Sequence, residues 1–105
     1  MKPAVPRNNT GMKILFLGDV MGRAGRAAIT THLPWLREEW KLDFVVVNGE
    51  NATSGMGLSG DHANILLDAG ADVVTLGDHA FAQKDMLTFI EKEQRIIRTL
   101  SYSRA

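Results

Sequence analysis

The stretch DFVVVNGEN at residues 43–51 decides the fold of this 105-residue chain. It opens with the apolar run Phe44-Val45-Val46-Val47, which is rich in β-branched residues, and it ends in a polar turn that contains glycine. A short continuous apolar run of this kind is typical of a strand that is buried on both faces of a parallel sheet. Two further runs, residues 13–18 and 72–77, have the same form and predict two more strands.

Helical patterns lie between these predicted strands and after the last of them. Apolar residues recur at helical spacing over residues 29–40, and Pro34 within that pattern predicts a kink or a restart of the helix. Ser59 is a suitable N-cap and Gly70 a suitable end for a second helix, and residues 84–93 predict a third. The order βαβαβα favours an α/β fold with a parallel sheet and right-handed crossovers.

The composition is that of one ordinary domain, with 45% hydrophobic and 23% charged residues. Twelve basic and twelve acidic residues cancel, so we expect neither duplex nucleic acid nor an anionic membrane as a partner. The absence of cysteine excludes a disulfide framework, a thiolate zinc site and a cysteine nucleophile.

The N-terminal residues 1–11 carry prolines and asparagines without periodicity, and we expect a flexible tail there, followed by one domain over residues 12–105. The longest apolar runs of the chain are too short to span a bilayer. No apolar secretory segment is visible near the N-terminus, so the cytoplasm is the expected location.

An acidic residue follows the end of each predicted strand. Asp19 follows the first strand, Glu50 the second and Asp78 the third, while Asn51 adjoins Glu50 and His79 adjoins Asp78. Ligands of open α/β sheets bind beyond the carboxyl ends of the strands, so we expect these five side chains to converge at one edge of the sheet. Hard oxygen donors beside an imidazole suit Mn, Fe, Mg or Zn, and a carboxylate such as that of Glu50 can bridge two ions.

Each of these residues taken singly has an ordinary structural interpretation. Asp and Asn are common in turns and at helix N-caps, and His79 alone would be a loop histidine. A glycine precedes each acid, which we interpret as letting the chain turn so that the acidic side chain faces the crevice. The recurrence of this pattern after three separate strands favours a functional site over three unrelated turns.

Nucleotide binding is an alternative, because several glycines follow the first predicted strand. The dinucleotide fingerprint needs a glycine where Val20 stands, and the phosphate loop of nucleotide hydrolases needs a lysine where Arg26 follows Gly25. Arg23 and Arg26, near the start of the first helix, could contact a phosphate, although two solvated arginines are slightly favoured.

Taken together, the three motifs resemble those of a known family. The segments MKILFLGDVMG at residues 12–22, VNGENA at 47–52 and TLGDH at 75–79 are similar to the motifs of the YmdB-like branch of the calcineurin-like metallophosphoesterases. The resemblance extends from Met12 to about Tyr102. It implies a phosphodiesterase with two divalent metal ions (Fe, Mn, Zn or Mg) that acts on a phosphodiester or cyclic nucleotide such as the 2′,3′ forms.

The resemblance also implies a role for each candidate residue by its position in the motifs. Asp19 and Asn51 would hold the first metal, Glu50 would bridge both metals, and Asp78 would be a ligand of the second. The two cations would polarise the phosphate and lower the pKa of a bridging water, which attacks in line. His79 would then protonate the leaving oxygen.

The chain departs from the family pattern in three ways. Asp78 stands where the family usually has asparagine, and Ala82 where members often carry an acid. The family chain is also much longer, and its later part supplies histidine ligands and the second sheet of an α/β/β/α sandwich. We therefore expect an N-terminal portion of such an enzyme, which forms half of the sandwich, binds metal weakly and hydrolyses phosphodiesters poorly or not at all. We also expect an exposed apolar sheet face through which copies could associate as a homo-oligomer. The alternative is a non-catalytic α/β remnant or nucleotide-binding module.

Overall fold

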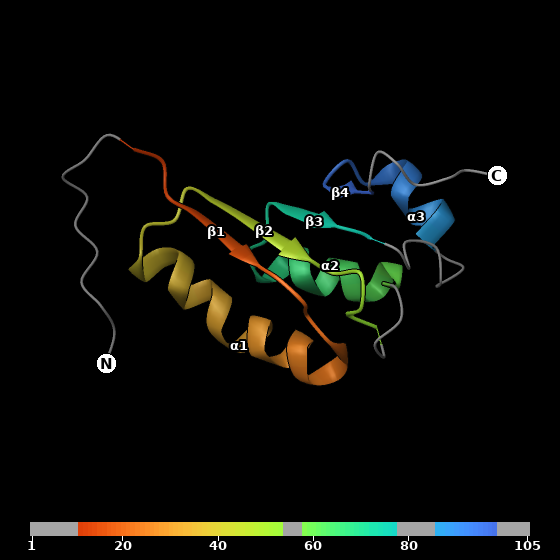
Figure 1. Ribbon diagram of the computed structural model, residues 1–105, viewed down its shortest axis with the longest axis horizontal. Helices are drawn as coiled ribbons and strands as arrows, with labels where there is room; N and C mark the ends of the chain where they lie inside the picture. Colours follow the sequence, from red (N-terminus) through yellow and green to blue (C-terminus); the bar gives the residue numbers. More distant parts are fainter. Residues whose placement is uncertain (1–10, 54–57, 78–85, 99–105) are drawn as a thin grey trace.

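The computed structural model describes residues 11–53, 58–77 and 86–98 (Figure 1). Along these residues strands and helices alternate in the order β1 (Ile14–Leu17), α1 (Gly22–Glu39), β2 (Phe44–Asn48), α2 (Gly60–Ala69), β3 (Val73–Thr75), α3 (Met86–Lys92) and β4 (Ile96–Ile97). Most of the predicted tail, residues 1–10, lies outside the described residues. None of the helices in the described ranges is long and apolar enough to cross a membrane.

The strands form one parallel sheet in the order β1-β2-β3-β4, which confirms the predicted α/β fold. In this sheet Leu17 pairs with Val47, and Val47 pairs with Val74. Strand β4 was not predicted, because the two residues Ile96 and Ile97 are too few to form a recognisable pattern. It adds to the edge of the sheet through pairing of Ile96 with Val74.

The first helix differs from its prediction in its starting residue and at Pro34. It begins at Gly22, well before the apolar spacing becomes visible, and it continues through Pro34 without a restart. Pro34 is exposed, whereas Ile29 and Leu33 are buried, so the proline ring faces solvent while the packed side of the helix is kept. A proline inside a helix removes one backbone hydrogen bond, a loss that the packing of the neighbouring turns outweighs here.

The second helix begins and ends where the sequence predicts. The Ser59 side chain accepts a hydrogen bond from the His62 N–H at 3.2 Å and so caps the helix. Gly70 ends the helix with a φ of 130°, in the region that favours glycine. The helix buries Leu66 and Leu67 toward the sheet.

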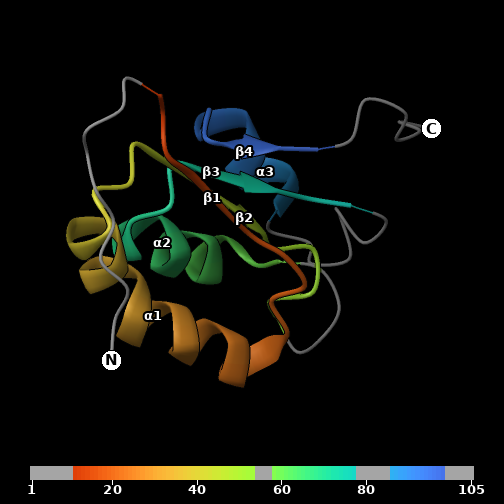
Figure 2. The same ribbon diagram turned by 60° about the vertical axis from the view of Figure 1, so that its left-hand side comes forward.

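Helices α1 and α2 lie side by side against one face of the sheet (Figure 2). The side chains of Val45, Val47 and Val74 lie on this face of the sheet and have no exposed surface. The largest fully buried side chains are Leu33, Leu58, Leu66, Leu76, Met86, Val45, Val47 and Val74. The core of the described structure therefore lies between the sheet and the helices α1 and α2, and α3 adds Met86 to it.

The opposite face of the sheet carries exposed apolar side chains. Ile14 and Phe16 of β1 are each 60% exposed, Ile97 of β4 is 49% exposed, and Phe44 of β2 is 37% exposed. Side chains of a strand alternate between the two faces, so these residues share the face that α1 and α2 do not cover. The expected exposed apolar face is confirmed, and association of copies through it stays a prediction.

Candidate functional site

The first predicted ligand, Asp19, lies on an exposed turn after β1. Its backbone has a φ of 55°, the left-handed region, and its side chain is exposed. The preceding Gly18 does not have a positive φ, so the left-handed residue at this strand end is the acid and not the glycine. Asp tolerates the left-handed region better than most residues because its short polar side chain can bond locally. The chain therefore turns at the acidic residue itself.

The second acid, Glu50, lies at the end of β2 and reaches over the end of β3. A Cβ at Gly77 would lie 2.5 Å from Cδ and 2.6 Å from Oε2 of Glu50. The Asn48 side-chain amide donates to Oε1 of Glu50 at 3.3 Å, and the Glu50 N–H donates to Oδ1 of Asn48 at 3.3 Å. Gly77 thus leaves space for the carboxylate, which is a different role from the predicted turn.

Two hydrogen bonds join the start of α1 to the loop that carries Glu50 and Asn51. The Gly22 N–H donates to the Asn51 carbonyl oxygen at 3.1 Å, and Nη1 of Arg26 donates to the Ala52 carbonyl oxygen at 2.6 Å. Because β1 and β2 are adjacent and parallel, their carboxyl ends open onto the same edge. The structure thus brings the loop of Asp19 together with the loop of Glu50 and Asn51.

The remaining two predicted site residues, Asp78 and His79, lie outside the described residues, as does Ala82. Within the described ranges no group of three or more His, Asp or Glu side chains could hold a metal ion. The described donors are two carboxylates and one amide, on Asp19, Glu50 and Asn51, and such oxygen donors fit part of a divalent-cation site. Metal binding by this set stays a prediction.

The two arginines of the first helix behave differently from one another. Arg23 is exposed, as the solvated interpretation expects. Arg26 is half-buried and donates a hydrogen bond to the Ala52 carbonyl oxygen. Neither a phosphate contact nor a solvated side chain, the two roles considered for it, includes this bond. No sequence pattern indicates this bond, because it joins residues 26 positions apart.

A second polar cluster, also missed in the sequence, joins the same loop to the start of α2. Thr53 is 8% exposed, and its Oγ1 lies 2.6 Å from Nδ1 of His62. The same Oγ1 accepts a hydrogen bond from the Ser59 N–H at 2.9 Å. The loop after β2 is thus fixed to α1 at Ala52 and to α2 at Thr53.

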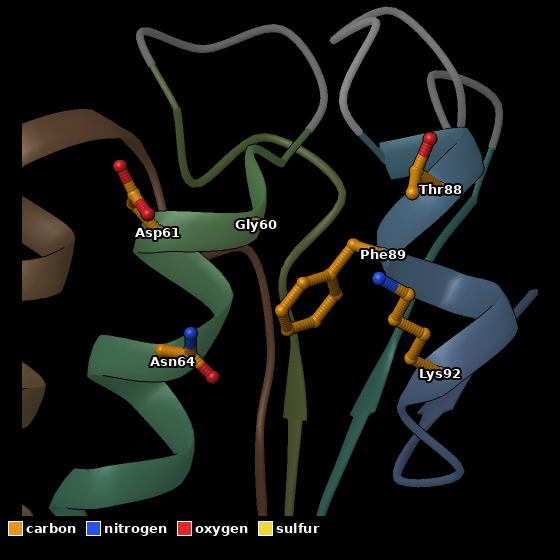
Figure 3. A pocket seen from close by; sticks show the side chains of 6 residues that line it. All are labelled: Gly60, Asp61, Asn64, Thr88, Phe89 and Lys92. Atoms are coloured by element: carbon orange, nitrogen blue, oxygen red, sulfur yellow. The ribbon is translucent and has the colours of Figure 1, made fainter.

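A shallow cavity of about 240 Å³ lies between α2 and α3 (Figure 3). The Phe89 ring points from α3 toward α2, and the predicted ligands Asp19, Glu50 and Asn51 are not among the residues that line the cavity. The lining residues are Gly60, Asp61, Asn64, Thr88, Phe89 and Lys92.

Comparisons with known proteins point to one family. Residues 15–105 match the family described as YmdB-like protein. A Mycoplasma genitalium protein whose name describes it as a putative phosphatase/phosphodiesterase is 43% identical over 90 residues, which make up 86% of this chain and 32% of that protein. A 2′,3′-cyclic-nucleotide 2′-phosphodiesterase of Bacillus subtilis is 36% identical over 91 residues, or 87% of this chain and 34% of that enzyme.

A solved structure has the same fold over the same part of the chain. The crystal structure of a novel phosphatase from Mycoplasma pneumoniae superposes with a TM-score of 0.80 at 39% identity, covering 88% of this chain and 33% of that one. The chain spans about a third of the length of the relatives that it matches.

Proposed function

This chain belongs to the YmdB-like protein family, and we propose that it carries the metal-binding edge of a phosphodiesterase that uses two divalent metal ions. The observation that supports the proposal best is the position of Glu50. Its carboxylate extends from the loop after β2 to Gly77, which follows β3. Gly77 directly precedes Asp78 in the sequence. A carboxylate that lies between two strand ends is suitably located to bridge two ions.

In this proposal each residue has one task. Asp19 and Asn51 would hold the first ion, Asp78 would hold the second, and Glu50 would bind both. Such ions would supply polarisation of the phosphate and a lower pKa for a bound water. His79 donates a proton from its ring nitrogen to the oxygen that leaves.

The proposed substrates are phosphodiesters, including 2′,3′-cyclic nucleotides. The name of the Bacillus subtilis relative supports this class, and the Mycoplasma relatives are named as phosphatases or phosphodiesterases more generally.

Titration with Mn²⁺ tests the metal site directly. We expect weak binding by this chain, since the described donors make only part of a two-metal site, and we expect binding to be lost in Glu50→Gln. The glutamine keeps the size of the side chain and removes its charge, so the unfolding midpoint serves as the control for folding. Equal Mn²⁺ binding by the unaltered chain and by Glu50→Gln would contradict the proposed site.

A chimera tests the reaction. The segment of the Bacillus subtilis enzyme that matches this chain is replaced by residues 15–105, and hydrolysis of a 2′,3′-cyclic nucleotide is measured with added Mn²⁺. We expect turnover that Glu50→Gln and Asp19→Asn each abolish in the chimera. A folded chimera that binds Mn²⁺ without turning over substrate would instead support the non-catalytic alternative.

A further inference from the structure

The loop that carries Glu50 and Asn51 is a tight turn closed by a hydrogen bond. The Ala52 N–H donates to the Gly49 carbonyl oxygen at 3.1 Å, so Glu50 and Asn51 are the two central residues of a four-residue turn. The turn is held at its first residue, because the Gly49 N–H donates to the Thr75 carbonyl oxygen of β3 at 2.9 Å. The orientation of both side chains therefore depends on what holds the last residue of the turn.

Arg26 holds that last residue. Its Nη1 donates to the Ala52 carbonyl oxygen at 2.6 Å, and Gly22, one helical turn earlier in α1, donates its N–H to the Asn51 carbonyl oxygen at 3.1 Å. One bond would leave the loop free to rotate about its acceptor, whereas two bonds to successive carbonyl oxygens fix both its position and its orientation. Ala52 has no exposed surface, so its carbonyl group has little access to water as a replacement partner.

We propose that Arg26 is a positioning residue of the metal-binding edge. Its guanidinium group holds the turn of Glu50 and Asn51 in place beside the start of α1, and it does so through the backbone of Ala52 rather than by contact with metal or substrate. This inference rests on the proposed function, because the metal site is the feature that Arg26 would organise. Residues behind the direct ligands of a metal commonly set its affinity in this way.

Arg23 offers a matched control on the same helix. It has the same charge and lies three residues earlier, but it is exposed. Arg26→Met removes the donor and keeps an unbranched side chain, while Arg23→Met makes the same change in net charge. A difference between the two variants therefore separates positioning from a general electrostatic effect on a bound cation.

The first measurement is Mn²⁺ affinity by calorimetry on the unaltered chain and these variants. We expect Arg26→Met to raise the Kd for Mn²⁺ by about tenfold, the lower end of the range for residues that orient metal ligands. Arg23→Met should leave the Kd within about twofold, and Arg26→Lys, which keeps one cationic donor, should recover part of the affinity. Unchanged affinity in Arg26→Met, or an equal loss in both methionine variants, would overturn the proposal.

The second measurement does not depend on the metal. Hydrogen exchange of the Ala52 amide reports whether the turn stays closed, and the Ala63 amide, which donates to Ser59 within the first turn of α2, serves as the reference. We expect Arg26→Met to speed exchange at Ala52 by about tenfold or more relative to Ala63, and Arg23→Met to leave the ratio unchanged. An unchanged ratio in Arg26→Met would overturn the positioning role.

These two measurements also distinguish failure of this inference from failure of the proposed function. If the unaltered chain and Glu50→Gln bind Mn²⁺ equally, the metal site is refuted, and the exchange ratio alone decides whether Arg26 holds the turn. If Glu50→Gln loses Mn²⁺ while Arg26→Met keeps it, the metal site stands and the role of Arg26 is refuted. Should Arg26→Met fail to fold, Arg26→Lys is compared with the unaltered chain by both measurements, and equality in both would refute the inference.

Discussion

The acidic residues at the two ends of the strands differ in their contacts. At the edge where β2 and β3 begin, Asp43 and Asp72 are bonded to the backbone of neighbouring strands: the Lys13 N–H donates to Oδ2 of Asp43 and the Val45 N–H donates to Oδ2 of Asp72, each at 2.8 Å. At the edge where the strands end, Asp19 is exposed and makes no such bond among the described residues.

Arg37 of α1 also contacts Asp72 and so links this helix to the edge where β2 and β3 begin. Its Nη1 donates to Oδ2 of Asp72 at 2.6 Å and to the Gly70 carbonyl oxygen at 2.7 Å, and its Nη2 donates to Oδ1 of Asp72 at 3.3 Å. An acid that precedes a strand in this fold thus stabilises the junction of strand and helix. The contrast predicts that substitution of Asp72 lowers the stability of the fold more than substitution of Asp19 does.

The largest effect on stability is expected at Asp72. Asp72→Ala removes the acceptor for the Val45 N–H and leaves the half-buried Arg37 without its carboxylate partner. Hydrogen bonds to charged groups contribute about 1.5–3 kcal/mol, and we expect the free energy of unfolding to fall by about 2 kcal/mol. Urea unfolding measures the change, with Glu38→Ala as a control at an exposed position of α1. A loss at Asp72 no greater than that at Glu38 would contradict the structural role of this edge.

A smaller effect is expected when acid protonates Asp72. Partial burial raises the pKa of Asp72, but the hydrogen bonds from Arg37 and the Val45 N–H, together with the charge of Arg37, outweigh it and lower the pKa below its ordinary value of 3.8. A carboxyl with a lower pKa in the folded state stabilises the fold while it is ionised. Its contribution is therefore complete above the ordinary pKa and is lost as the pH falls through the lowered one.

The corresponding measurement is the free energy of unfolding as a function of pH. We expect the unaltered chain to lose stability as the pH falls from about 5 to below the ordinary pKa of Asp72, and we expect a shallower loss in Asp72→Asn, which cannot be protonated in this range. Parallel curves for the two chains would mean that Asp72 has the same pKa in the folded and unfolded states.

The central strands and helix α2 could be predicted from local sequence patterns. The apolar runs at 43–48 and 72–77 identified two strands, and Ser59 and Gly70 marked the ends of α2, because these signals depend on neighbouring residues alone. Strand β4 escaped detection because its pairing with β3, rather than its own sequence, makes it a strand.

The candidate site could be predicted only in part, for a related reason. The position of Glu50 and Asn51 after a strand is visible in the sequence, but the contacts that orient them are not. Arg26 bonds a backbone carbonyl 26 residues away, and Gly77 provides space for the Glu50 carboxylate from a different strand. Both contacts depend on tertiary structure, so composition and spacing carry no sign of them.

Gly77 provides a test in which stability and binding separate. Gly77→Ala places a Cβ 2.6 Å from Oε2 of Glu50, and the flexible carboxylate must move aside. We expect the free energy of unfolding to fall by about 1 kcal/mol, the lower end of the range for an added methyl group, because the atoms displaced end a flexible side chain, while the Kd for Mn²⁺ rises by about tenfold.

Gly18→Ala is the matched control for this change, because its Cβ would meet only Phe16 Cε2 at 3.5 Å, an ordinary contact distance. We expect the control to leave both quantities nearly unchanged. Equal Mn²⁺ affinities in the two alanine variants would show that the location of the Glu50 carboxylate over β3 does not matter for binding.

The smallest effect on stability is expected at Asp19. The residue is exposed and has a left-handed backbone with a φ of 55°, so Asp19→Ala would add strain of about 1 kcal/mol and confuse folding with binding. Asn has nearly the same shape and is enriched in this backbone region. Asp19→Asn should therefore change the free energy of unfolding by less than about 0.5 kcal/mol, the usual range for surface substitutions.

The same variant should lose most Mn²⁺ binding, because a neutral amide replaces the charged ligand. Urea unfolding and Mn²⁺ titration of one sample decide the matter: a stability loss as large as that of Asp72→Ala would erase the contrast between the two edges, and unchanged Mn²⁺ binding would remove Asp19 from the site.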